Sequence, residues 1–303
     1  MLVTSQYGKP RQILVLNTRN PIRKQIMPIV IANPVLPTSW TLNNVSYDSE
    51  IVAADFGTNG LTFDEAGTKM YTPVDVGTPT DRIDQYNLSG AWDLSTSSGV
   101  ISTKNINTQD SQPRCVGWSD DGTKMYVLGI NSDTISTFTA STPWLTSSAT
   151  YDGAGGDFVI AADGLPYCFR WQPGGDRFYV AGVSNKKIYY YDTASSWVVA
   201  GATWGGNVNS LDVVSEEGIP TSMAFKPDGS TMFMTGINTG PKVYQYSLPT
   251  AWELSDAVYT GLSYDLSADY ASGNAVGIVV NPDGDKMFIA SGSSGNGIRQ
   301  FSL

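Results

Sequence analysis

The chain repeats one short pattern five times, and this repetition constrains the fold more than any other feature of the sequence. Each repeat has a turn built on a glycine, in runs such as SDDGTKMYV and KPDGSTMFM. A tyrosine or phenylalanine follows four residues later, and a second aromatic run such as TISTF or KVYQY comes after it. The turn glycines lie 55, 53, 54 and 55 residues apart, at Gly67, Gly122, Gly175, Gly229 and Gly284. Such a regular period is typical of one supersecondary unit copied along the chain.

Each repeat predicts about four β-strands. Runs of β-branched and aromatic residues such as TSMAF alternate with turns containing Gly, Asp and Asn, and patterns of helical period are scarce. The turn glycine reverses the chain between the first two strands, because glycine adopts positive φ without steric cost. Four-stranded units repeated at this interval are the blades of a β-propeller. The sequence therefore predicts an all-β fold, a five-bladed β-propeller.

The two ends of the repeated region predict how the ring closes. Four repeats continue from the turn glycine to a tryptophan after 25, 22, 22 and 23 residues, but the fifth stops at Leu303. If Pro37 is taken as following Leu303, Trp40 lies 23 residues after Gly284 and completes the pattern. We therefore expect Trp40 to Tyr47 to form the outer strand of the last blade, so that residues 37–303 form the propeller. Closure would remove the sheet edges that otherwise invite aggregation.

The first strand of each repeat carries small residues at one recurring position. Seven residues before the turn glycines stand Gly60, Cys115, Cys168, Ser222 and Gly277. Large apolar residues stand six and four residues before the same glycines. Alternate residues face opposite sides of a sheet, so we expect a large face of each blade to pack on a small face of its neighbour. The two cysteines are expected to be buried thiols, with a redox or metal pair as the alternative. Arg170 departs from the repeat and is expected to face the central channel.

Composition and charge exclude several classes of function. The chain has no histidine, which removes the commonest general base and a common metal ligand. Residues 1–36 hold five cations and no acid, which leaves 13 cations against 28 acids, a net charge of −15, in the remainder. A body of that charge repels phosphate and disfavours nucleic-acid binding. The sequence predicts no signal peptide and no transmembrane segment.

Residues 1–36 lie outside the predicted ring and are expected to form an extended arm. The runs QILVLN and QIMPIVIANPVL are apolar, and exposing such side chains to water costs on the order of 1.5–3 kcal/mol each. Prolines within these runs favour an extended segment over a central strand. We expect the arm to dock on another protein by strand addition, and the alternative is that it folds back on its own acidic propeller. The predicted docking residues are Arg11, Ile13, Leu14, Val15, Arg19, Arg23, Lys24, Ile29 and Ile31.

Four acids recur twelve residues before the turn glycines and are the candidate ligand-binding residues. They are Asp55, Asp110, Asp163 and Glu217, and the fifth repeat has Ser272. Converging at one mouth of the channel, they could attract a cation or ligand. Alternatively, each acid could cap its own loop by accepting backbone N–H bonds. A calcium site would need more oxygens than the local loops supply, and no metal, cofactor or catalytic motif is recognised, so none is predicted.

The run Tyr189, Tyr190 and Tyr191 leaves a further alternative open. One face of this strand is expected to pack inward. The other face could stack on a sugar or a partner, or could also be core.

The repeats resemble a known group of propeller repeats. SDDGTKMYVLG with STPWLTSSATY, and KPDGSTMFMTG with LPTAWELSDAVY, resemble repeats of bacteriophage virion proteins and bacterial surface proteins. The first repeat departs from this pattern at Ala66, which replaces the usual turn aspartate, and at Gly99, where others have Tyr151, Trp204 or Tyr259. An irregular first blade is therefore expected.

The resemblance implies a non-enzymatic structural or attachment protein of a bacteriophage virion, in a tail or capsid fibre, knob or decoration. Its arm would dock on other virion proteins, and its propeller would present a recognition face to a host-surface glycan or protein. It would be assembled in the host cytoplasm, with several copies on a particle. The alternatives are a carbohydrate-active propeller enzyme of the glycoside hydrolase type and a bacterial surface lectin. The enzyme would use the channel-mouth acids as a carboxylate pair.

Overall fold

The computed structural model describes residues 40–51, 59–77, 79–238, 240–270, 274–292 and 297–303. The chain divides into two units, Met1–Thr38 and Ser39–Leu303. The predicted arm, its docking residues and the predicted boundary at residue 37 lie outside the described residues. The account below concerns the second unit.

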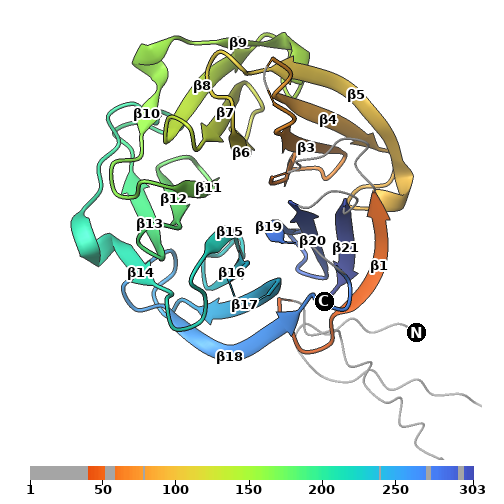
Figure 1. Ribbon diagram of the computed structural model, residues 1–303, viewed down its shortest axis with the longest axis vertical. Helices are drawn as coiled ribbons and strands as arrows, with labels where there is room; N and C mark the ends of the chain where they lie inside the picture. The colour runs from red at the N-terminus through yellow and green to blue at the C-terminus, as the bar shows by residue number, and fades with distance from the viewer. Residues whose placement is uncertain (1–39, 52–58, 78, 239, 271–273, 293–296) are drawn as a thin grey trace, which may run out of the picture. The chain divides into compact units, whose positions relative to one another are not determined.

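The described chain forms five antiparallel sheets arranged as a five-bladed β-propeller, as predicted (Figure 1). Blade 1 contains β2 (Thr62–Phe63), β3 (Lys69–Val74), β4 (Arg82–Leu88) and β5 (Ser97–Asn105). Blade 2 contains β6 (Pro113–Trp118), β7 (Lys124–Gly129), β8 (Thr134–Ala140), β9 (Ala149–Tyr151) and β10 (Phe158–Val159). Blade 3 contains β11 (Pro166–Trp171), β12 (Arg177–Gly182), β13 (Lys187–Asp192) and β14 (Ser210–Asp212). Blade 4 contains β15 (Pro220–Phe225), β16 (Thr231–Gly236), β17 (Lys242–Ser247) and β18 (Val258–Asp265). Blade 5 contains β19 (Ala275–Val280), β20 (Lys286–Ser291), β21 (Ile298–Ser302) and β1 (Ser46–Ile51).

Helical structure in the described residues is limited to short 3-10 turns outside the blades. They are η1 (Leu94–Thr96), η2 (Thr146–Ser148), η3 (Ala154–Gly156) and η4 (Gly206–Asn209). None of the described helices is long and apolar enough to span a membrane.

The ring closes through the N-terminal strand, but the strand begins later than predicted. Strand β1 pairs antiparallel with β21, with Tyr47 opposite Phe301 and Glu50 opposite Arg299 (Figure 1). The predicted bounds of this strand, Trp40 to Tyr47, are therefore wrong, since the strand runs from Ser46 to Ile51. Trp40 itself has a φ of 67° and lies before the strand. A residue in this left-handed conformation does not extend a β-strand.

Each tryptophan of the repeat packs on the turn glycine of its own blade. All five tryptophans have φ between 56° and 67°, and each backbone N–H donates to the carbonyl of the paired glycine. A Cβ on Gly122 would lie 2.3 Å from the Trp144 ring, so only glycine allows this contact. We call each such pair a socket: Trp40–Gly284, Trp92–Gly67, Trp144–Gly122, Trp197–Gly175 and Trp252–Gly229.

Each socket is also bonded to the preceding blade through the tryptophan carbonyl. Three carbonyls accept from tyrosine hydroxyls, namely Trp144 from Tyr71 at 2.8 Å, Trp197 from Tyr126 at 2.5 Å and Trp252 from Tyr179 at 2.7 Å. The others accept from different donors, Trp40 from Gln245 Nε2 at 3.3 Å and Trp92 from Lys286 Nζ at 3.0 Å. These bonds connect every blade to the next around the ring.

The core lies between the blades, and the inner strands approach closely at the axis. Phe169 of blade 3 packs where Gly117 of blade 2 has no side chain, since a Cβ there would lie 2.9 Å from the ring. The expected packing of a large face on a small one holds at this contact. The three consecutive tyrosines 189–191 are all buried, which leaves no exposed ring for stacking on a sugar.

Blade 1 is irregular, in line with its departures from the repeat. Its first strand has only two residues, and the pairing of β4 with β5 shifts register on both sides of Tyr86. Gly99 has a φ of 80° in this outer strand.

Candidate functional site

The three recurrent acids that the structure describes, Asp110, Asp163 and Glu217, lie at the end of the blades remote from the turn glycines, and their carboxylates are bonded to loop backbone. Asp110 accepts from the N–H groups of Gln112 and Ser132 at 2.7 and 2.9 Å. Glu217 accepts from Ile219 and Asn238, both at 2.8 Å. These contacts are those of loop caps, the alternative considered from the sequence.

Asp163 also bonds to loop backbone, and in addition it accepts a hydrogen bond from a tyrosine hydroxyl. Its carboxylate accepts from the N–H groups of Leu165, Ser184 and Asn185 at 2.9–3.0 Å, and from the Tyr189 hydroxyl at 3.3 Å. Burial, together with the nearby charge of Asp163, raises the pKa of Tyr189 to about 12, so this hydroxyl stays protonated and donates.

The carboxylates of Asp110, Asp163 and Glu217 therefore hold loops at one end of the inner strands. Asp110, Asp163 and Glu217 are 6%, 3% and 1% exposed, and Asp55 and Ser272 lie outside the described residues. No cluster of metal-ligating side chains is found among the residues that the structure describes. A ligand role for the four acids stays a prediction.

The opposite end of the inner strands, which we call the turn face because it carries the five turn glycines, is hollowed. Two cavities of 180 and 220 Å³ share Thr62, Arg170, Trp171 and Pro173. The first extends toward blade 2, where Trp118 lines it, and the second extends toward blade 4, where Phe225 lines it. We call the combined space the turn-face pocket. Residues of all five blades line it, so it lies where the inner strands converge.

The walls of this pocket are aromatic pairs produced by the repeat. In blades 1 to 4 the last residue of the inner strand packs against the socket tryptophan of its own blade. Ring centroids are 4.8 Å apart for Phe63–Trp92, 5.5 Å for Trp118–Trp144, 5.0 Å for Trp171–Trp197 and 5.4 Å for Phe225–Trp252. The indole N–H groups of Trp118 and Trp171 have no hydrogen-bond partner in the protein. Both nitrogen atoms are themselves buried, so they are orphaned donors within the wall of the pocket and do not face its space.

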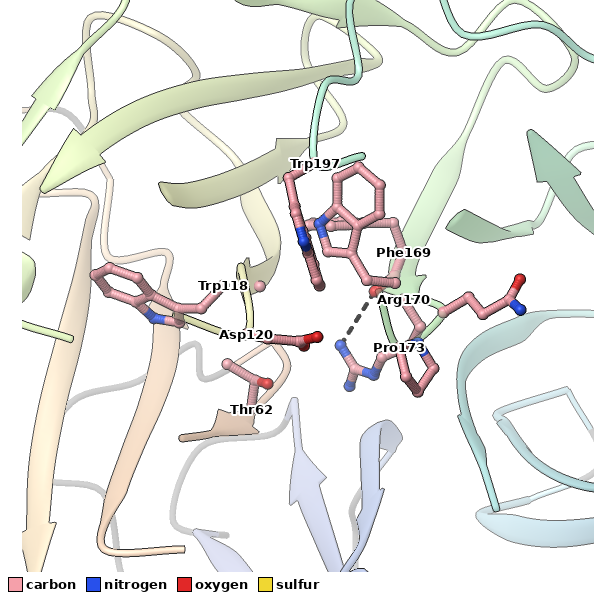
Figure 2. A pocket seen from close by; sticks show the side chains of 10 residues that line it. Thr62, Trp118, Asp120, Phe169, Arg170, Pro173 and Trp197 are labelled. Atoms are coloured by element: carbon pink, nitrogen blue, oxygen red, sulfur yellow. Dashed lines mark hydrogen bonds between the residues drawn. The ribbon is translucent and has the colours of Figure 1, made fainter. Parts of the chain in front are cut away.

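One cation forms the floor of the pocket. Figure 2 shows the Arg170 side chain pointing into the space between the labelled residues, with its bond to the Phe169 carbonyl dashed. Its Nη2 donates to the carbonyls of Leu61 and Ile278 at 2.9 and 3.1 Å, so this side chain reaches blades 1 and 5 from blade 3. The side chain fits because the same position in the other blades is small, with Thr62, Gly117, Ala224 and Val279.

The carboxylate lining this space is Asp120, in the turn of blade 2. It is exposed, and its Oδ2 accepts from the N–H of Gly174 at 3.1 Å. Glycoside hydrolysis by the usual route needs two carboxyl groups on either side of the scissile bond. The described lining thus combines apolar rings, one cation and one carboxylate, a composition suited to binding a small ligand.

The fold has counterparts among solved structures. No family model matches this sequence, and no curated protein is detectably similar to it. A provisionally assigned 6-phosphogluconolactonase from Bacteroides uniformis is 17% identical, with a TM-score of 0.50 over 84% of this chain and 70% of that one. A second protein so assigned, from Bacteroides fragilis, is 11% identical, with a TM-score of 0.47 over 77% of this chain and 76% of that one. At these identities the likeness to the first concerns the fold alone.

The sequence did not predict the turn-face pocket. Trp118 and Trp171 looked like packing residues, because each repeat has a large apolar residue at that position. The available signal was Arg170, a charged residue in an otherwise apolar inner strand. That signal placed a side chain near the axis, but it gave no indication of the aromatic-walled hollow around it.

Proposed function

We propose that this chain is a non-enzymatic recognition module, whose turn-face pocket binds a sugar unit of a host-surface glycan. The observation that supports this most is a pocket walled by aromatic rings, with Arg170 and the exposed Asp120 in its lining. A sugar ring presents an apolar face to such walls and its hydroxyl groups to the Asp120 carboxylate.

The size and polarity of the pocket favour a small ring over an extended chain. Its two cavities, of 180 and 220 Å³, together lie near the lower end of the roughly 300–1,000 Å³ range of sites for drug-sized ligands. Catalysis is disfavoured because Asp110, Asp163 and Glu217 bond to backbone at the far end of the inner strands, away from the pocket.

The second part of the proposal is that the module belongs to a bacteriophage virion, to which residues 1–36 attach it. The basis is the resemblance of the repeats and the contrast between a basic, apolar arm and an acidic body. Opposite charges favour rapid and correctly oriented docking of such an arm on an acidic partner.

Glycan binding tests the first part. The intact protein is applied to an array of bacterial surface glycans, and a ligand found there is titrated. Trp171→Phe keeps an aromatic wall and should change the affinity little, whereas Trp171→Ala removes the wall and should lower the affinity by about 10- to 100-fold. Trp204→Ala is the matched control, because Trp204 is 38% exposed and does not line the pocket. Equal binding by all variants, or no glycan bound, would contradict the proposal.

Turnover and particle assembly separate the alternatives. A glycoside hydrolase would cleave a glycan of the array and lose that activity in Asp110→Asn or Asp163→Asn. Reversing the arm charges at Arg19, Arg23 and Lys24 to glutamate should abolish incorporation into particles and leave glycan binding unchanged. A surface lectin would bind its glycan and never be incorporated.

A further inference from the structure

The two cysteines of the chain meet at the axis of the ring. Cys115 lies in β6 of blade 2 and Cys168 in β11 of blade 3, and their sulfur atoms are 3.0 Å apart. Both are unpaired and buried, with 0% and 2% of their surface exposed. Ser222 Oγ of blade 4 donates to Cys168 Sγ at 3.3 Å. Two thiols thus lie in contact across a blade junction, separated by 53 residues of chain.

The guanidinium of Arg170 lies against this pair. Its Nη1 is 3.1 Å from Cys115 Sγ, and its other bonds go to neutral backbone carbonyls. Among the described residues it has no carboxylate within ion-pair distance, although a buried cation is costly without an anionic neighbour. The titratable groups that act on the pair are the two thiols themselves and Arg170.

The two thiols differ in how readily they lose a proton. Burial opposes ionisation of Cys168, but the hydrogen bond from Cys115, the charge of Arg170 and the Ser222 hydroxyl together lower its pKa. Burial, and then the hydrogen bond and charge of Cys168, raise the pKa of Cys115. Of the two thiols, Cys168 is therefore the one that ionises more readily.

We propose that Cys115 and Cys168 are a modification site, at which a hydroperoxide converts them to a reversible disulfide between blades 2 and 3. The Cys168 thiolate attacks one oxygen of hydrogen peroxide, and the O–O bond breaks to give Cys168 sulfenic acid and hydroxide, which takes a proton from solvent. The Cys115 sulfur then attacks the Cys168 sulfur and forms the S–S bond. The S–O bond of the sulfenic acid breaks, and the leaving hydroxyl group takes the Cys115 proton and departs as water. Two thiols and one peroxide yield one disulfide and two waters.

The turn-face pocket provides the route for the oxidant. Arg170 lines both cavities of the pocket and also contacts Cys115, so one side chain separates the sulfur atoms from the hollow. Hydrogen peroxide is little larger than water and carries no charge that Arg170 would repel. The equivalent positions in the other blades are Gly60, Ser222 and Gly277, so a disulfide at this level can form only between blades 2 and 3.

The test oxidises the intact protein with hydrogen peroxide and maps its peptides without reduction. We expect a cross-linked pair of peptides containing Cys115 and Cys168, a mass lower by two hydrogens, and full reversal by dithiothreitol. The oxidised protein should also unfold at higher denaturant concentration, because a cross-link across a long loop restricts the unfolded chain. Thiols that remain free in the folded protein but oxidise after unfolding in urea would overturn the proposal, as would disulfides formed only between molecules.

Arg170 variants test the origin of the reactive thiolate. At neutral pH, Arg170→Met should slow disulfide formation by about tenfold, because fewer Cys168 thiols are ionised, whereas Arg170→Lys should stay close to the wild-type rate. The wild-type pH profile decides the point if Arg170→Met folds poorly. A midpoint below the ordinary thiol value of about 8.5 supports the thiolate, and a midpoint at or above it contradicts that role.

Discussion

All five blade junctions contain the same tryptophan–glycine socket, but they differ in the side chain that donates a hydrogen bond to the tryptophan carbonyl. At the junctions of blades 1–2, 2–3 and 3–4, a tyrosine on the second strand of one blade donates to the tryptophan carbonyl of the next. At junctions 4–5 and 5–1 the equivalent residues are Phe233 and Phe288, which pack near Trp40 and Trp92 with ring centroids 6.3 and 6.0 Å apart. The packing is kept in both kinds of junction, and the hydroxyl is not.

The difference shows what the repeat has to preserve. A buried carbonyl without a donor costs about 1–3 kcal/mol, so each junction must supply one. The phenylalanine junctions do so from other residues, with Gln245 Nε2 on β17 and Lys286 Nζ on β20, two residues before Phe288. Shape is therefore fixed position by position, whereas hydrogen bonding is satisfied by whichever neighbour can reach.

The largest effect is expected from emptying a socket, and it should be similar in both kinds of junction. Trp144→Ala and Trp40→Ala each remove a ring packed on glycine and on the neighbouring blade, so each should lower the free energy of unfolding by about 3–5 kcal/mol. Urea denaturation followed by circular dichroism gives both values. The control is Trp204→Ala, at an exposed tryptophan outside the sockets, which should cost less than about 1 kcal/mol. A loss at Trp144 but not at Trp40 would mean that closure does not depend on the fifth socket.

The next effect should separate the junctions. Tyr126→Phe leaves the Trp197 carbonyl without its donor and should cost about 1–3 kcal/mol. Tyr179→Phe should cost less, because Arg177 Nη1 also donates to the Trp252 carbonyl at 3.1 Å. Phe233→Tyr should give no gain, because Gln245 already donates to the Trp40 carbonyl. Equal costs for the two Tyr→Phe variants would contradict the view that a second donor compensates.

Burial explains why the tyrosines act as donors at every ordinary pH. Desolvation raises the pKa of Tyr126 and of Tyr71 far above the ordinary phenol value, so both hydroxyls remain protonated. The difference between the junctions should therefore persist into mildly alkaline solution.

Sequence and structure agree most where the repeat itself carries the information. The spacing of the glycines and tryptophans predicted five blades and their closure through the N-terminal strand, because these residues must meet in every copy. It did not predict that the tryptophans adopt positive φ, and for that reason the closing strand was placed too early, at Trp40 instead of Ser46.

The site was less predictable because it depends on contacts between blades. The pattern suggested that Arg170 faces the axis, but its bonds to Leu61 and Ile278 depend on how closely five inner strands converge. The orphaned indole N–H groups of Trp118 and Trp171 are likewise visible only in three dimensions.

A smaller effect is expected at the junction of blades 5 and 1 when the side chain that donates to the Trp92 carbonyl is changed. Lys286→Met keeps the length of the side chain but takes away the bond to the Trp92 carbonyl, so it should cost about 0.5–1.5 kcal/mol. Lys124, the equivalent lysine of blade 2, bonds instead to Thr139 and Asp152. Lys124→Met should therefore cost less, and a larger loss there would mean that the Trp92 bond contributes little.

The smallest expected effect is a loss of stability in acid. It should arise in the glycine turns that carry the sockets of both kinds of junction. The hydrogen bond from Lys226, followed by those from Ser230, lowers the pKa of Asp228 to about 2, and bonds from Ser119 and Thr123 lower that of Asp121. Because the folded-state pKa is depressed, the stabilisation is complete above the ordinary aspartate pKa of about 4 and is lost as the pH falls toward 2. Asp228 is exposed, so less than about 1 kcal/mol is at stake. Asp228→Asn should flatten the stability profile of the intact protein over this range, as measured by urea denaturation at a series of pH values. The blade 3 turn has Gly174 at this position, so Gly174→Asn should leave the profile unchanged. If Asp228→Asn leaves the acid dependence intact, that dependence arises from groups other than Asp228.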